Sequence, residues 1–397
     1  MTRLAVGTRD PEPTRARTAV LGAFVVNGLC FASWLPRTPA VKDALSLSSG
    51  QLGLLLLCLS GGAFAAVPMS GPAVHRLGAA RVVWLGSATV GLGLTGLGAG
   101  LITGIVWFAA VGLAITGAGM STWDVAMNIE GAAVEHRRGR PLMPLLHGVF
   151  SIGTLAGGGL AVVSSTVGLP LTVQVLGTAL VAPLSMAIIT RSFLPASDPE
   201  PDGQRVASGS LRAWLEPRTL LIGLFTLAFA FTEGSANDWT AVALVDGHHT
   251  GEAFGAVGFG AFVLAMTVGR LSGVAVLERH GRVPVLRGIV VIAMTGVLLV
   301  ILAPFAALAL VGALLWGLGA SLGFPIGMSA AADEPARAAV RVSVVGSISY
   351  TASLAGPPLI GLLAEHVGIL RALIVVAGAL IVAALAAPAA RPPVKAA

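Results

Sequence analysis

Long stretches of this sequence carry no charged side chain, and this feature limits what the chain can fold into. Residues 82–123, 141–190 and 288–332 contain no Asp, Glu, Lys or Arg. Over the whole chain only 11% of the residues are charged and 55% are hydrophobic, whereas a soluble domain carries about 25% charged residues. We therefore expect a lipid bilayer, rather than water, to surround most of the folded surface.

The positions of the charged residues predict twelve membrane-spanning helices. A spanning helix needs roughly 20 mainly apolar residues, so each of the three long runs has room for two helices, with breaks near 100–104, 168–170 and 304–305. Single helices are expected at 18–36, 44–75, 219–232, 253–269, 342–364 and 372–390. The two shortest of these runs reach full length only if Glu233 and Arg270 lie inside the helices. The expected fold is an all-α membrane protein.

The placement of Lys and Arg predicts that both termini lie in the cytoplasm. With that orientation, only Arg37, Lys42 and Arg371 of the 24 Lys and Arg residues fall outside. Short cytoplasmic loops carry such an excess of basic residues in membrane proteins. We therefore expect a multi-pass protein of the bacterial plasma (inner) membrane.

An internal repeat divides the helices into two sets of six. The polar stretch 195–217 lies between the sets, and glycines recur at a nearly constant shift, Gly53 as Gly255 and Gly71 as Gly273. A six-helix repeat preserves orientation, so the bundles are expected to be related by a pseudo-two-fold axis normal to the membrane, with a substrate site at their interface. The expected divisions are an N-terminal tail at 1–17, bundles at 18–194 and 218–390, a cytoplasmic loop at 195–217 and a C-terminal tail at 391–397.

Both halves carry a glycine and basic signature between their second and third helices. It reads G-P-A-V-H-R-L-G-A-A-R from Gly71 to Arg81 and G-V-A-V-L-E-R-H-G-R from Gly273 to Arg282. Here the sequence resembles the major facilitator superfamily, whose signature is G-x-x-x-D-R-x-G-R-R, although His75 stands where the family usually has Asp. In the family this loop stabilises one conformational state. The resemblance implies that role for Gly71, Arg76, Gly78, Arg81, Gly273, Glu278, Arg279 and Gly281.

Polar residues inside the predicted spans point to a functional site, because ionisable groups in a membrane are costly. Asp124 and Asn128 are four residues apart and share a helix face. Counting from the basic hairpin that follows, His147 is expected at roughly the depth of Asn128 to Glu130, and Ser151 near the depth of Asp124. A carboxylate with no Lys or Arg in its span is expected to bind a proton and to exchange it when water enters. The alternative is interhelical hydrogen bonding, worth about 0.6 kcal/mol on average.

This block resembles the fucose–proton symporter branch of the superfamily, and more closely the uncharacterised bacterial relatives of that branch. The sequence reads D-V-A-M-N from Asp124 to Asn128, and then G-R-P-L-M-P-L-L-H-G-V-F-S-I-G from Gly139 to Gly153. The resemblance implies that Asp124 is the protonatable acid and that Asn128 and His147 line the substrate path. The sugar symporter pattern has Gln at the His147 position and a further acid in the first helix, where this chain has Asn27.

The seventh predicted helix carries a second group of polar residues, in which Glu233 and Asn237 share a face. We expect Arg37 and Asp238 to pair across the outer mouth when it closes; the alternative is that each anchors its helix separately. The expected outer-gate residues are Trp34, Arg37, Asp238 and Trp239. The expected substrate-binding residues are Asn27, Asn128, His147, Ser151, Asn237 and Tyr350, and the expected proton-coupling acids are Asp124 and Glu233.

These patterns predict a secondary active transporter that moves a small polar or sugar-like solute by alternating access, as a proton-coupled symporter. The alternative is a proton-coupled antiporter that exports drugs or metabolites. By family pattern that antiporter has an Arg early in the fourth helix and a Gly-Pro motif in the fifth, and the stretches 105–109 and 155–159 lack them.

Other classes of protein find little support in the sequence. The pattern G-L-G-L-T-G at 91–96 lies in a predicted membrane helix, whereas a dinucleotide loop follows a strand. Asp246, His248 and His249 could bind a metal, but no further metal ligand lies near this short stretch. The basic residues form no face suited to nucleic acid. The sequence therefore predicts no enzyme activity, no cofactor, no metal and no nucleic-acid partner. We expect a monomer whose partners are its solute, protons and lipid.

Overall fold

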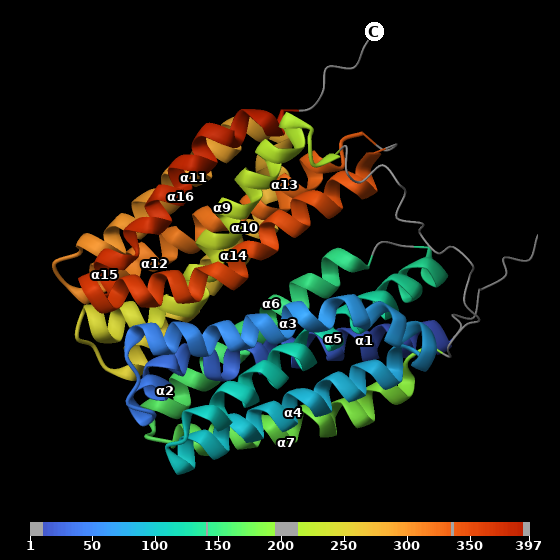
Figure 1. The fold of residues 1–397 in the computed structure, drawn as a ribbon. Coiled ribbons are helices and arrows are strands. Elements are labelled where there is room, and N and C mark those ends of the chain that lie inside the picture. The colour runs from blue at the N-terminus through green and yellow to red at the C-terminus, as the bar shows by residue number, and fades with distance from the viewer. Residues whose placement is uncertain (1–10, 140–141, 195–212, 335–336, 392–397) are drawn as a thin grey trace, which may run out of the picture.

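The computed structural model describes residues 11–139, 142–194, 213–334 and 337–391. Every regular element within these ranges is a helix, as Figure 1 shows, and this confirms the all-α prediction. Residues 1–10, 195–212 and 392–397, which belong to the predicted tails and central loop, lie outside the described residues.

The helices of the N-terminal half follow the predicted spans. They are α1 (Pro11–Trp34), η1 (Leu35–Arg37), α2 (Thr38–Ala44), α3 (Ser49–Leu77), α4 (Ala79–Thr103), α5 (Val106–Arg138), α6 (Met143–Thr166), α7 (Leu171–Ile189) and η2 (Thr190–Ser192). The two predicted breaks fall at Gly104 and Gly168, whose φ angles are 71° and 70°. Glycine adopts this left-handed conformation at little steric cost, so the chain can reverse there between long apolar helices.

The C-terminal half repeats this order of long helices. It contains α9 (Pro217–Val242), η3 (Ala243–Gly247), α10 (Glu252–His280), α11 (Arg282–Leu302), α12 (Ala306–Ala320), α13 (Gly323–Ala331), α14 (Ala338–Val367), α15 (Ile369–Ala372), α16 (Ile374–Ala386) and η5 (Ala387–Ala390). The third predicted break lies between α11 and α12. Glu233 and Arg270 lie inside α9 and α10, as the spans required.

Eleven helical stretches of the described chain are long and apolar enough to cross a membrane. The twelfth predicted span lies in α14, which has 30 residues and includes Ser347, Ser349, Tyr350, Thr351 and Ser353. This helix packs against α9 of its own half and α3 of the other. Because protein surrounds much of α14, it can carry polar side chains that lipid would disfavour.

The two sets of helices form two bundles that lie side by side. In Figure 1, α1 to α7 make up the lower bundle and α9 to α16 the upper one. The ribbons of the two bundles lie close together near α2 and α15, and they diverge toward the C-terminus of the chain. We call the first region the α2 end and the opposite region the terminal end.

Glycines allow helices within a bundle to pack closely. The G-x-G-x-x-G pattern lies inside α4, where Gly93 faces Gly112 of α5. A Cβ atom on Gly112 would lie 2.6 Å from the carbonyl oxygen of Gly93, so a larger residue cannot be accommodated without a shift. The pattern therefore serves helix packing, as small residues commonly do in membrane bundles.

Candidate functional site

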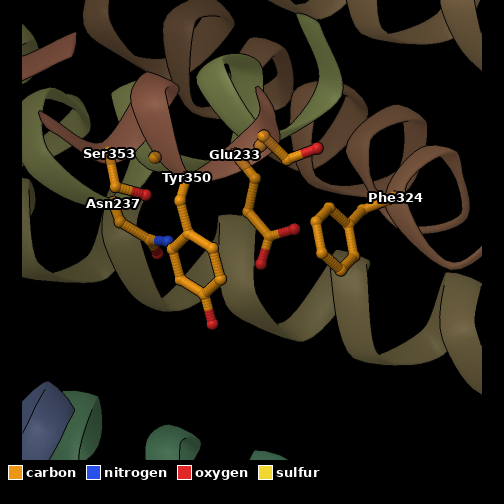
Figure 2. Close-up of a pocket in the computed structure, with 8 residues that line it drawn as sticks. Glu233, Asn237, Phe324, Tyr350 and Ser353 are labelled. Atoms are coloured by element: carbon orange, nitrogen blue, oxygen red, sulfur yellow. The ribbon is translucent and has the colours of Figure 1, made fainter. Parts of the chain in front are cut away.

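A cavity of about 260 Å³ lies in the C-terminal bundle and brings together three of the predicted site residues. Its lining consists of Ala230, Glu233, Gly234 and Asn237 from α9, Phe324 from α13, and Ser349, Tyr350 and Ser353 from α14. Figure 2 shows Glu233 and Tyr350 side by side, with the phenol pointing toward the helices of the other bundle. Tyr350 is 54% exposed although it lies in the middle of a long helix. The cavity therefore faces the space between the bundles.

Glu233 is held by an arginine to which sequence reasoning gave no role. The Nη2 atom of Arg270, on α10, donates hydrogen bonds to both carboxylate oxygens of Glu233, at 2.9 and 3.0 Å. The sequence did contain one signal for this pair. The predicted span at 253–269 reaches full length only if Arg270 lies inside it, and a basic residue inside a membrane helix needs an acidic partner. Because Glu233 is already paired, it is not a free acid in this structure.

Asp124 forms no ion pair within the described residues. Among the described side chains, only Asn128 forms a hydrogen bond with Asp124, and its Nδ2 lies 3.2 Å from Oδ1 of Asp124 and 2.9 Å from the Asp124 carbonyl oxygen. The carboxylate shares a face of α5 with Gly117 and Gly131, which lie seven residues, or about two turns, to either side. Gly117 packs on α3, and Gly131 on α6 and α1.

The face of α5 that carries Asp124 therefore points away from the periphery of the bundle. The helices α3 and α6, which flank this face, are those that contact the other bundle through α14 and α10. The opposite face of α5 packs on α4, where Trp123 is fully buried. Asp124 thus lies on the inner side of its bundle.

Asn27 lies on α1 at the level of Asp124. A Cβ atom on Gly131 would lie 3.7 Å from Cγ1 of Val20, which sets the register of these two antiparallel helices. Asn27 follows Val20 by seven residues and Asp124 precedes Gly131 by seven, so the two positions share a depth. Asn27 is only 2% exposed and its Nδ2 atom has no hydrogen-bond partner among the described residues. A buried amide donor without a partner is costly.

His147 and Ser151 lie on α6 at the predicted depths. A Cβ atom on Gly131 would lie 2.5 Å from Cδ1 of Leu146, so His147 is level with the residue that precedes Gly131. This places the ring about 9 Å along the axis from Asp124, at 1.5 Å per residue. The ring packs edge-on against Phe24 of α1, with 5.7 Å between centroids. The Ser151 hydroxyl donates to the carbonyl oxygen of His147 at 3.2 Å. No direct bond joins His147 to Asp124 among these described side chains.

The predicted pairing of Arg37 with Asp238 is wrong. Arg37 forms an ion pair with Glu252 at the start of α10, with its Nη2 atom 3.1 Å from Oε2. Its Nη1 atom donates to Gln174 at 2.9 Å and to the carbonyl oxygen of Leu169 at 3.0 Å. The error has a geometric cause, because the helical stretch of α9 and η3 continues to Gly247. Asp238 therefore lies about 13 Å inside the helix end, at 1.5 Å per residue.

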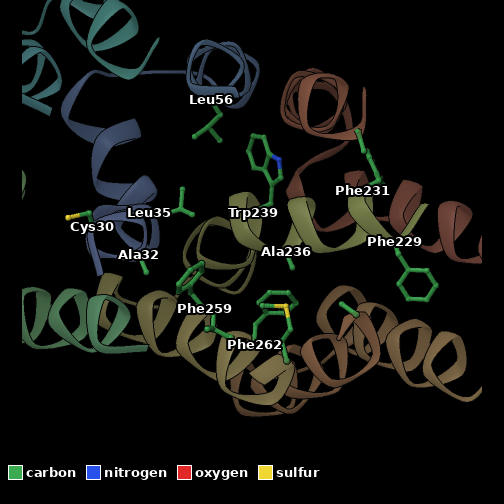
Figure 3. Close-up of a cluster of buried hydrophobic side chains, with 14 of the residues drawn as sticks. Cys30, Ala32, Leu35, Leu56, Phe229, Phe231, Ala236, Trp239, Phe259 and Phe262 are labelled. Carbon is green, nitrogen blue, oxygen red and sulfur yellow. The ribbon is translucent and has the colours of Figure 1, made fainter. Parts of the chain in front are cut away.

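The two predicted gate tryptophans lie in the protein interior rather than at a membrane interface. Trp34 is 4% exposed and Trp239 is fully buried. Figure 3 shows the indole of Trp239 next to Leu56 of α3, so that it joins an apolar cluster shared by both bundles. Trp239 therefore helps to close the α2 end by packing.

Two further clamps, which sequence reasoning missed, join the bundles at the α2 end. Lys42 forms an ion pair with Asp246, one of the residues considered above for a metal site. The carboxylate of Glu365, near the end of α14, accepts hydrogen bonds from the Ser48 hydroxyl and from the Gly50 amide at 3.2 Å. A carboxylate is favourable at this position because it faces the N-terminus of α3.

The terminal end shows a different pattern. Its ion pairs lie within the C-terminal bundle, where Asp333 binds Arg218 and Arg282, and Glu216 binds Arg337 and Arg341. Every hydrogen bond or ion pair found between the bundles, within the described ranges, lies at the α2 end. Among the described residues, hydrogen bonds and ion pairs therefore join the bundles at the α2 end.

The two hairpin signatures occupy equivalent turns at the terminal end. Gly78 and Gly281 adopt φ angles of 81° and 74° between consecutive helices, which explains why glycine stands at both positions. In the part of the chain that the structure describes, Arg76, Arg81, Glu278 and Arg279 form no ion pair. The basic residue that does form one here is Arg282, which directly follows the second signature glycine.

Comparisons with known proteins agree with this architecture. The profile of the Major Facilitator Superfamily matches residues 20–339. An uncharacterized MFS-type transporter of Yersinia pestis is 31% identical over 344 residues, which cover 86% of this chain and 87% of the relative. The fold is similar to that of a mutant of the nucleoside transporter NupG, with a TM-score of 0.80 at 14% identity over 94% of this chain and 99% of that one. It is also similar to the E. coli fucose:proton symporter FucP, with a TM-score of 0.62 at 15% identity over 94% and 98% of the two chains.

Proposed function

The chain belongs to the Major Facilitator Superfamily, whose members are transporters and not enzymes, and on this premise we propose that it imports a small polar or sugar-like solute together with protons. It would do so as a monomer in the bacterial plasma membrane, by alternating access of a site between its two bundles. The single observation that carries the proton-coupling part is the contrast between the unpaired Asp124 and the paired Glu233.

The contrast between the two acids assigns them different roles. Glu233 has a counter-ion in Arg270, so it can remain ionised inside the membrane. Asp124 has only the amide of Asn128 beside it, and a lone carboxylate is expensive to keep ionised away from water. Asp124 is therefore the acid that we assign to proton binding and release, and Glu233 becomes part of the substrate cavity.

The cavity suits a small uncharged solute with several hydroxyl groups. Its wall offers the hydroxyls of Tyr350, Ser349 and Ser353, and the Oδ1 atom of Asn237 has no partner among the described residues. The Arg270–Glu233 pair adds polar atoms but little net charge. At about 260 Å³, the cavity is near the lower end of ligand pockets, which range from about 300 to 1,000 Å³.

The arrangement of the bundles corresponds to an inward-facing state if both termini lie in the cytoplasm, as the basic residues predict. The α2 end then faces outside and is closed by the Arg37, Lys42 and Glu365 clamps. A solute from outside could reach the cavity only after these contacts separate. Asn27, Asn128, His147 and Ser151 would line the N-terminal wall of the same path.

Uptake into proteoliposomes with an imposed proton gradient tests this proposal. Sugars, polyols and drug-like cations are screened as labelled solutes. Asp124→Asn should abolish gradient-driven accumulation while leaving exchange between solute pools on the two sides. The matched control is Asp43→Asn, which makes the same change at an exposed position of helix α2 and should leave accumulation intact.

Two outcomes would revise the proposal. If Asp124→Asn still accumulates solute against its gradient, Asp124 is not the coupling acid. If wild-type vesicles expel a loaded solute in exchange for external protons, the protein is the alternative, an efflux antiporter.

A further inference from the structure

A second cavity of about 400 Å³ lies in the C-terminal bundle and does not include the residues of the candidate site. It is a groove between α10 and α11, with α12 at its back. Its lining is mainly apolar and includes Gly269, Ser272, Val276 and His280 from α10, Gly288 from α11 and Leu318 from α12. Nothing lies within 4 Å of a Cβ atom built on Gly288, so the α11 wall of the groove is open.

The groove faces the surroundings of the bundle rather than the transport path. The elements against which α11 packs, namely α10, α12, α13, α15, α16 and η5, all belong to its own bundle. In Figure 1, α11 lies on the side of the upper bundle that is remote from the lower one. Ser272, Val276 and Gly288 are exposed along the groove. In a membrane, the molecules that can occupy such an apolar groove are lipid acyl chains.

Basic residues lie at the mouth of the groove on the terminal end. His280 belongs to the lining, and Arg279 beside it and Arg287 on α11 are exposed. Neither arginine forms an ion pair among the described residues. Unpaired basic groups beside an apolar groove between membrane helices complement the negatively charged head group of an anionic lipid. A zwitterionic lipid offers no net charge to match them.

We infer that this groove is a binding site for an anionic phospholipid, which places an acyl chain between α10 and α11 and its phosphate beside Arg279 and His280. The lipid belongs to the cytoplasmic leaflet if the orientation proposed above holds, but the groove and its charges do not depend on the transported solute. The bound chain lies against α10, the helix that carries Arg270. Gly269 faces the groove, and the next residue, Arg270, holds Glu233.

Native mass spectrometry of the full-length protein in detergent tests this inference. The protein is titrated with phosphatidylglycerol or with phosphatidylethanolamine of the same acyl chains. Wild-type protein should retain phosphatidylglycerol preferentially. Gly288→Phe fills the groove and should lower the bound fraction several-fold. Gly378→Phe is the matched control, because Gly378 is also exposed and a Cβ atom there also meets nothing within 4 Å.

The charge contribution is tested with a second pair of variants. The double change Arg279→Gln and His280→Gln should reduce phosphatidylglycerol binding to the level of phosphatidylethanolamine. Arg76→Gln, in the equivalent hairpin of the other bundle, should not. Equal binding of the two lipids by wild-type protein, or equal loss in Gly288→Phe and its control, would overturn the inference. If Gly288→Phe does not fold, Val276→Trp narrows the same groove from α10 and is judged by the same criterion.

Discussion

The ion pair between Arg37 and Glu252 sets how readily the α2 end opens, and Glu252→Gln is the smallest change that tests this. The bonds from Arg37 to Gln174 and Leu169 stay within one bundle, so only its bonds to Glu252 must break when the bundles separate. A hydrogen bond to a charged group contributes about 1.5–3 kcal/mol. The Glu252 side chain is 29% exposed, and water screens the pair, so we take about 2 kcal/mol.

This value predicts a measurable shift between the two conformations. Since each 1.4 kcal/mol corresponds to a factor of ten, about 2 kcal/mol shifts the equilibrium roughly 30-fold toward the outward-open state. An outward-open population of about 1% would rise to about 23%. The shift is large because the variant loses the charge of the carboxylate. The neutral amide keeps the shape of the side chain.

Thiol labelling from outside measures this population. Cys30 and Cys58 are the only cysteines of the chain, so both are replaced by Ala and a reporter is introduced as Ser151→Cys on the inner face of α6. A membrane-impermeant maleimide should label it many times faster in Glu252→Gln. Glu135→Gln is the control at the terminal end, because the Glu135 carboxylate accepts hydrogen bonds from the amides of Leu142 and Met143 in its own bundle, and it should leave the rate unchanged. An unchanged rate in Glu252→Gln, or an equal rise in both variants, would refute the gate.

Two further predictions concern ion pairs of the C-terminal bundle. Arg270→Met should leave Glu233 without its counter-ion, and should therefore lower solute uptake at least tenfold and lower the Tm. Adding Glu233→Gln to this variant should restore much of the Tm. A double variant as unstable as Arg270→Met alone would argue against the pair. Glu216 has a pKa lowered below its usual 4.5 by the hydrogen bond from Arg341 and by the charges of Arg341 and Arg337. A carboxylate whose pKa is lower in the folded than in the unfolded protein stabilises the fold at pH values above its unfolded-state pKa, and this stabilisation is lost as the pH falls through its folded-state pKa. The Tm should therefore decrease when the pH falls below about 4.5. Glu216→Gln should have a lower Tm at pH 7 but a smaller decrease in Tm in acid.

The helices could be predicted because the signals for them are local. A run without charge is long enough for one span or two, and Gly104 and Gly168 mark turns by their own conformational freedom. The depths of Asp124 and His147 also followed from counting residues from the hairpin between their helices. Such counting works because an α-helix rises by a constant 1.5 Å per residue.

The partners of the charged residues could not be predicted, because they depend on which helices face each other. Arg270 pairs with Glu233 across 37 residues, and Arg37 pairs with Glu252 across 215. The choice of Asp238 for Arg37 relied on placing both residues at the outer mouth, at the ends of the first and seventh predicted helices. The structure shows that helix α9 continues past Asp238, so the nearest acid in space comes from the start of the next long helix.

The distribution of these contacts has an energetic consequence for transport. The α2 end carries three clamps between the bundles, at Arg37, Lys42 and Glu365, whereas the pairs at Asp333 and Glu216 stay within one bundle. If each clamp contributes about 1 kcal/mol or more, the three together favour the closed α2 end by more than about 100-fold. A ligand can reverse such a preference only through a larger difference in its affinity for the two states. Neither the solute cavity nor Asp124 touches a clamp. We therefore expect the difference in affinity to come from groups that the bundles bring together only when the terminal end closes. Asp124 and His147 lie on one side of that interface, and the Arg270–Glu233 pair lies on the other.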